Sequence, residues 1–235
     1  MFFRRHLSAS KEDENNYLLE YRFSGYPRKY FKEIHSSLQK RYSISHRNYH
    51  YVPHITIAGP IITKNENDLI DILEKIIFKY AHFFHEKNNL IRTEKFIKFD
   101  TDEGEILAVQ VIPPFSLINL KRELEKVLSS KKNITCKTYE VPIWHTTIWN
   151  VKHSFRDNKD KIKIISDDLC SMKIQEMSFI LDRISLIKNK KILKEFDLVN
   201  LKTLDRFESL NNAKRYSSYL KIKEELEKKG EKFKF

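Results

Sequence analysis

The chain has 235 residues, of which 40% are hydrophobic, so it can bury a sizeable core as one domain or as two small lobes. Lysine and arginine outnumber aspartate and glutamate by 44 to 32, and the net charge of +12 fits either an anionic partner such as nucleic acid or a lysine-rich solvated surface. Four scattered glycines exclude a P-loop or a dinucleotide fingerprint, and two isolated cysteines favour a reducing compartment over a disulfide or zinc framework. Because the chain has neither an apolar run of 18 residues nor an apolar leader, we expect a cytoplasmic protein without membrane contact.

The first half of the chain predicts the order strand, helix, strand, helix, strand. Alternating apolar residues indicate strands, and apolar residues three and four positions apart indicate helices. Asn67 or Asp68 is expected to cap the second helix, and Gly59 and Pro60 are expected to end the second strand. The expected elements are a strand over 17–23, a helix over 28–42, a strand over 54–58, a helix to about 80 and a strand over 91–99.

The second half repeats this order, and the repetition predicts an α+β (α/β) fold made of two related lobes. We expect a flexible N-terminus over 1–16, a domain over 17–200 with lobes of about 17–100 and 101–200, with or without strand exchange, and a charged helical extension over 201–235. The expected elements of this half are a strand over 105–112, a helix over 117–128, a strand over 143–151, a helix over 157–170, strands over 177–187 and 192–199, and a C-terminal helix over 212–229.

Two short segments carry the same pattern of a histidine, any residue, a threonine and an apolar residue. They begin at His54 and His145, which are 91 positions apart, and each lies in a strand-like run near the middle of its half. Alternate side chains of a strand lie on one face, so His54 shares a face with Thr56, and His145 shares a face with Thr147. One such segment is uninformative, whereas two at matching places indicate a duplicated unit with one catalytic histidine in each copy.

If the two strands adjoin, two imidazoles and two hydroxyls converge on one small volume. Threonine hydroxyls donate hydrogen bonds to phosphate oxygens. One neutral histidine can accept a proton from an attacking water while a protonated histidine donates a proton to the leaving oxygen, since histidine titrates near neutral pH. An in-line displacement at phosphorus needs both tasks on opposite sides of the phosphate, so this set of residues predicts phosphoester chemistry with no metal ion and no cofactor.

The paired motif resembles that of the two-histidine phosphoesterase superfamily, which includes the RNA 2′,3′-cyclic phosphodiesterases, also called 2′-5′ RNA ligases. The resemblance covers about residues 17–199 and implies a bilobal fold with two mostly antiparallel sheets, flanking helices and a central cleft. It also implies that His54 and His145 are the acid/base pair, that Thr56 and Thr147 hold the phosphate, and that an RNA end yields a 2′-phosphate product.

Two departures from the family pattern concern the fourth motif position and the phosphate anchor. The fourth position is isoleucine in both copies, where leucine is commoner in the family. Some bacterial members carry an arginine soon after the second motif, where this chain has Asn150 and Lys152. A third phosphate anchor is therefore open, and Lys152 and Arg22, which lies on the first predicted strand, are both candidates.

Aromatic residues near the motifs are candidate accessory residues. Strict alternation puts Trp149 on the face of His145 and Thr147, where its ring either stacks on a base or belongs to the core. Tyr51, just before the first motif, belongs either to a substrate-gating loop or to ordinary aromatic packing.

Three hypotheses for the function follow from these residues. The first is hydrolysis of 2′,3′-cyclic phosphate ends of RNA or of nucleotides, with RNA ligation as a secondary reverse reaction. The second is the same chemistry on 2′-5′ oligoadenylate or on a small cyclic nucleotide. The third is a basic RNA-binding module without turnover, whose RNA binding would depend on salt and be indifferent to loss of the histidines. We expect a monomer whose partners are RNA ends or nucleotides.

Overall fold

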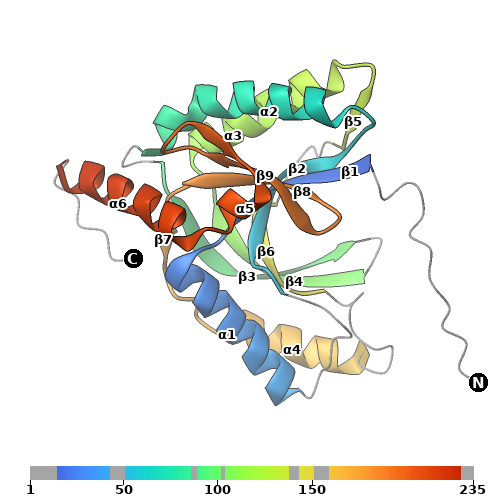
Figure 1. Ribbon diagram of the computed structural model, residues 1–235. Coiled ribbons are helices and arrows are strands. Elements are labelled where there is room, and N and C mark those ends of the chain that lie inside the picture. Colours follow the sequence, from blue (N-terminus) through green and yellow to red (C-terminus); the bar gives the residue numbers. More distant parts are fainter. Residues whose placement is uncertain are drawn as a thin grey trace, which may run out of the picture.

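Two antiparallel sheets lie between two pairs of helices in the computed structural model (Figure 1). The structure describes residues 15–42, 51–85, 89–101, 104–137, 143–150 and 159–228. Helices α2 (Glu66–Tyr80) and α3 (Phe115–Ser129) cover one side, and α1 (Gly25–Arg41) and α4 (Lys159–Ser171) cover the other. The α+β prediction is therefore confirmed.

The strands form a six-stranded sheet, in the order β10-β9-β8-β1-β2-β5, and a four-stranded sheet, in the order β6-β4-β3-β7. We call them the first and the second sheet. The strands of the first sheet are β1 (Asn16–Arg22), β2 (His54–Thr63), β5 (Ile134–Cys136), β8 (Arg183–Lys188), β9 (Lys191–Asp197) and β10 (Lys202–Leu204). Those of the second sheet are β3 (Ile91–Thr101), β4 (Gly104–Ile112), β6 (His145–Asn150) and β7 (Ser178–Phe179). A 3-10 helix (Ala81–His85) follows α2, and the chain ends in α5 (Arg206–Ser209) and α6 (Asn212–Lys228).

The two sheets show how the halves of the chain are related. In the first sheet β1 pairs with β2 on one side and with β8 on the other, whereas in the second sheet β4 pairs with β6 and with β3. The pair β1 and β2 of the first half is thus extended by β8 of the second half, and the pair β4 and β6 of the second half is extended by β3 of the first half. The helices follow the same exchange, because α1 contacts β6 and α3 contacts β2. The motif strands β2 and β6 hold corresponding places in this arrangement.

Strand β2 continues past the point where the sequence predicted its end. Gly59 has a φ of +129°, which favours glycine, and a Cβ there would lie 2.9 Å from Leu18 Cδ2 and 3.1 Å from the Tyr17 carbonyl oxygen. The backbone of β1 therefore approaches β2 closely at this residue, and the strand runs on to Thr63, where it pairs with β5. The prediction that Gly59 and Pro60 end the strand was wrong.

Three further differences from the predicted elements concern local signals. The N-cap of α2 is Asn65, whose side chain accepts a hydrogen bond from the Asp68 amide at 3.2 Å, rather than Asn67 or Asp68. The apolar run over 177–187 is two strands, since β7 belongs to the second sheet and β8 to the first. The short strands β5 and β10 were not predicted, whereas the C-terminal helix is present as α6.

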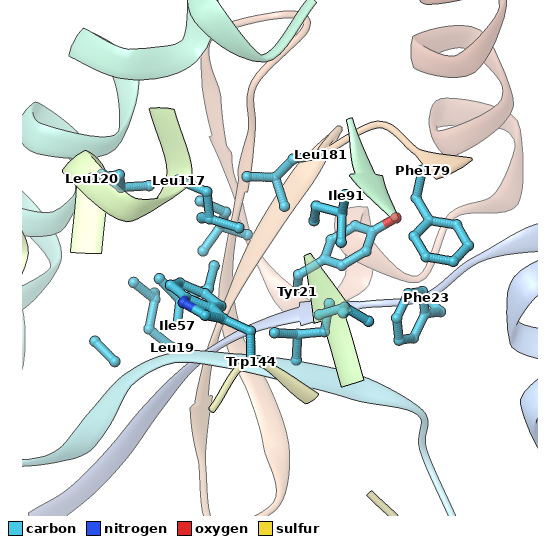
Figure 2. Packing of buried hydrophobic residues seen from close by; sticks show 14 of the residues in the cluster. Leu19, Tyr21, Phe23, Ile57, Ile91, Leu117, Leu120, Trp144, Phe179 and Leu181 are labelled. Carbon is cyan, nitrogen blue, oxygen red and sulfur yellow. The ribbon is translucent and has the colours of Figure 1, made fainter. Parts of the chain in front are cut away.

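A buried apolar cluster joins the first sheet to α3. Figure 2 shows Leu19 of β1, Ile57 of β2 and Leu117 of α3 within it, together with Trp144, which directly precedes β6. The core therefore fixes a residue of the first motif, Ile57, and the residue directly before the second, Trp144. None of the helices within the described ranges is long and apolar enough to cross a membrane.

A buried polar network fastens α6 to the first sheet. Arg183 of β8 lies 2.9 Å from the Glu195 carboxylate and 3.4 Å from that of Asp197, and all three side chains are at most 3% exposed. Ser218 of α6 donates to Asp197 at 2.8 Å, and Arg215 lies 3.3 Å from Glu195. The C-terminal helix is thus held by charge and hydrogen bonds on this part of the sheet.

Candidate active site

Both motif strands have the same irregular shape. In β2 the histidine and threonine are accessible, Ile55 is buried, and two buried residues follow the threonine, so the strand departs from strict alternation. In β6 the pattern is the same, with Thr146 buried and two buried residues after Thr147. The register shifts against β1 and β4 fall at these same places, next to Leu19 and Leu107. A β-bulge one residue after each threonine is therefore part of the repeated unit.

The two imidazoles are held by the same hydrogen bond. Nδ1 of His54 lies 2.8 Å from the Val52 carbonyl oxygen, and Nδ1 of His145 lies 2.7 Å from the Ile143 carbonyl oxygen, in each case two residues earlier. A carbonyl oxygen only accepts, so Nδ1 carries the hydrogen in both rings. In the neutral imidazole Nε2 is then the unprotonated nitrogen, which is the form that accepts a proton.

The structure brings the two motif strands together. Strand β2 contacts β6 although they belong to different sheets. Burial lowers the pKa of His145 below its ordinary value, the hydrogen bond to Ile143 acts in the opposite direction, and the positive charge of His54 lowers it further. An electrostatic effect between the two rings requires that they share one neighbourhood. His54, His145 and Thr147 are half-buried and Thr56 is exposed, so all four side chains are open to a ligand.

The neighbours of His54 on β1 are charged. Arg22 is its cross-strand partner, and Glu20 is the partner of Thr56. Glu20 is 3% exposed, and its carboxylate accepts a hydrogen bond from Arg22 Nε at 3.0 Å and lies 3.6 Å from His54 Nε2. The last distance is too long for a hydrogen bond but close enough for an ion pair when the imidazole is protonated.

The described cross-strand neighbours of His145 and Thr147 are neutral. Its cross-strand partner on β4 is Gln110, and the partner of Thr147 is Ala108. The ring of Phe99 on β3 packs against the His145 ring edge to face, with centroids 4.8 Å apart. This ring supplies part of the burial that lowers the His145 pKa.

The accessory residues divide into one near the motifs, two in the core and one outside the described residues. Arg22 lies directly across from His54. Trp149 is 1% exposed, because the bulge after Thr147 rotates it off the face of His145 and packs it near His35. The predicted shared face with His145 was wrong, and of the two alternatives for this ring the structure agrees with a place in the core. Tyr51 is 7% exposed and stacks on His35 at 4.3 Å, so it is a packed residue rather than part of an open gating loop. Lys152 lies outside the described residues.

Two residues that the sequence reasoning missed take part in the site or support it. Glu20 alternates with Leu19 and Tyr21 in β1, and this pattern also fits an exposed strand face, so only the pairing with β2 reveals its place. Lys121 of α3, which is 7% exposed, donates to the carbonyl oxygen of Ile57 at 3.2 Å, at the bulge after Thr56. A lysine among the apolar positions of α3 was the available signal for it.

Metal-ligating side chains are not gathered in the described parts of the chain, where no three histidine, cysteine, aspartate or glutamate residues form a group that could hold an ion.

Comparisons with known proteins add little to this geometry. No family model matches the chain, and no curated protein matches it. Among solved structures, it is similar to Usb1 of Kluyveromyces marxianus with uridine monophosphate, at 9% identity and a TM-score of 0.40, over 83% of this chain and 99% of that one. A second structure of the same Usb1 gives 9% identity and a TM-score of 0.41, over 82% and 99%. At these values the similarity carries no argument about the site.

Proposed function

We propose that the protein is a metal-independent phosphodiesterase that hydrolyses 2′,3′-cyclic phosphate ends of RNA or of nucleotides. The observation that supports this most is the matched pair of imidazoles. Two histidines on contacting strands make the same Nδ1 hydrogen bond, and each leaves Nε2 for chemistry. A residue kept only for packing has no need of the same hydrogen bond, the same bulge and the same accessible threonine twice.

The phosphate is held by hydroxyl and cationic donors. The hydroxyls of Thr56 and Thr147 donate to its non-bridging oxygens, each from two positions after its histidine on the same strand. Arg22, directly across from His54, is the candidate third anchor because its guanidinium is always charged and matches phosphate geometry. These contacts fix the phosphorus between the two rings, and the net charge of +12 favours an anionic substrate.

The reaction needs one proton acceptor and one proton donor. Water attacks phosphorus while a neutral imidazole takes one of its protons at Nε2, and a new P–O bond forms. The bond from phosphorus to the ribose 3′-oxygen breaks, and that oxygen takes its proton from Nε2 of the second, protonated imidazole. The product is a 2′-phosphate, and the exchanged proton returns through solvent. Each of these two roles is worth roughly 10² to 10⁴ in rate.

Replacement of each histidine tests this proposal. His54→Ala and His145→Ala are each expected to lower kcat on a cyclic-phosphate-ended RNA by at least about 100-fold. His82, an exposed residue of the 3-10 helix, is a matched control, and His82→Ala is expected to leave kcat unchanged. Activity of the parent is expected to survive EDTA. Parent-like turnover by either motif variant would refute the proposal.

A substrate panel separates the alternative functions. The panel contains a cyclic-phosphate-ended RNA, a nucleoside 2′,3′-cyclic phosphate and 2′-5′ oligoadenylate, and the preferred substrate has the highest kcat/KM. Salt-dependent RNA binding that persists in both histidine variants, with no turnover of any member by the parent, would identify a binding module instead.

A further inference from the structure

The two copies of the motif differ in the strand that pairs with them. Thr56 lies opposite Glu20, and the matching Thr147 lies opposite Ala108. His54 lies opposite Arg22, and the matching His145 lies opposite Gln110. The repeated hydrogen bonds and bulges make the motifs alike, but the strand opposite the first motif carries a charged pair and the strand opposite the second carries neutral residues.

Glu20 occupies the centre of a polar row across the first sheet. The row runs from Thr56 through Glu20 and Ser185 to Glu195, by direct cross-strand pairing. Ser185 donates to Glu195 at 3.0 Å, so that hydroxyl is committed away from Glu20. The carboxylate of Glu20 instead uses one oxygen for Arg22 and presents the other to Nε2 of His54 at 3.6 Å.

We propose that Glu20 is a positioning residue that acts through His54 and makes it the proton donor of the reaction. The inference rests on the function proposed above. Both ring nitrogens of His54 then face oxygen atoms that only accept, namely the Val52 carbonyl on Nδ1 and the Glu20 carboxylate on Nε2. A ring that donates from both nitrogens, as the proton donor of the reaction does, matches this pair of acceptors. Arg22 brings a positive charge opposite His54, and its hydrogen bond to Glu20 at 3.0 Å keeps the carboxylate in place.

His145 has the opposite environment. Facing it are the ring of Phe99 from β3, the neutral side chains opposite it on β4 and the charge of His54 from β2. Among the described residues no carboxylate lies within ion-pair distance of it. The lowered pKa of His145 agrees with a neutral ring that accepts the proton of the attacking water. His54 then gives its Nε2 proton to the leaving 3′-oxygen and becomes neutral as His145 becomes charged.

The pH dependence of kcat/KM in Glu20→Gln tests the inference. The variant keeps the shape of the side chain and removes its charge, so the alkaline limb of the profile is expected to move to lower pH by about one unit. The acidic limb, set by the proton acceptor, is expected to stay in place. Arg22→Gln removes the opposing cation, so its alkaline limb is expected to move to higher pH even if the loss of a phosphate anchor lowers the rate.

Two controls make the outcome specific. Glu123→Gln changes the net charge by the same amount at a carboxylate of α3 that is paired with Lys79, and its profile is expected to match that of the parent. If Glu20→Gln is active and neither limb of its pH profile shifts, the proposed role of Glu20 is overturned, while the phosphodiesterase proposal stays intact. A shift of the acidic limb alone would assign His54 as the proton acceptor and would also overturn the proposed role of Glu20. A parent without turnover on any panel substrate would refute the proposed function, and the inference with it.

Discussion

The stability of the folded protein is expected to depend on pH through the carboxyl group of Asp182, which lies just before β8. Burial raises its pKa from 3.8 to about 6, and Glu195 acts in the same direction, although the positive charges of Arg215 and Arg183 oppose the rise. Between these two pH values the folded protein holds a proton that the unfolded chain has released. Stability contributed by this group is therefore present at low pH and is lost as pH rises from about 4 to about 6.

Asp182→Asn removes this dependence, because the amide stays neutral at every pH in the range. A pKa higher by about two pH units corresponds to about 3 kcal/mol. The difference in free energy of unfolding, variant minus parent, is therefore expected to grow by roughly this amount as the pH rises from 4 to 7. Urea denaturation of both proteins at several pH values gives this difference directly. A constant difference between variant and parent over the whole range would refute the reasoning.

Three further predictions concern the motif threonines, Trp149 and Lys121. Thr56→Val and Thr147→Val are each expected to lower kcat/KM roughly 10- to 100-fold, because a hydrogen bond to a charged group is worth about 1.5–3 kcal/mol. Thr135→Val, at an exposed position of β5, is the control and is expected to leave kcat/KM unchanged. Trp149→Ala is expected to cost about 3–5 kcal/mol in urea denaturation, as a core residue does, and a loss confined to substrate affinity would contradict its assignment to the core. Lys121→Met is expected to lower the free energy of unfolding by about 1–3 kcal/mol, since it leaves the Ile57 carbonyl and Glu125 without this partner. Lys79→Met removes an exposed ion pair and is the control. A loss for Lys121→Met no larger than that for Lys79→Met would contradict the prediction.

The elements and the paired motif could be predicted because their signals are local. Apolar spacing located α1, α2, α3 and most strands to within a few residues, and the two histidines were recognisable from four-residue patterns. The apolar run over 177–187 contains no residue that marks a break, so its division between two sheets depends on tertiary pairing.

The parts of the site that could not be predicted depend on register. Strict alternation placed Trp149 with His145, but a bulge, which has no sequence signal here, turns it into the core. Glu20 and Ala108 become comparable only when each is seen opposite the threonine of its motif. The acid and base roles looked equivalent in the sequence because the motifs are alike, and the difference between them lies on the neighbouring strands.

The most direct test of a shared site is an NMR titration that follows the ring nitrogens of His54 and His145 while a nucleoside 2′-monophosphate is added. If a single phosphate lies between the two rings, both Nε2 signals move together and saturate with one and the same dissociation constant. Movement of only one ring, or two distinct dissociation constants, would mean that the two histidines serve separate sites.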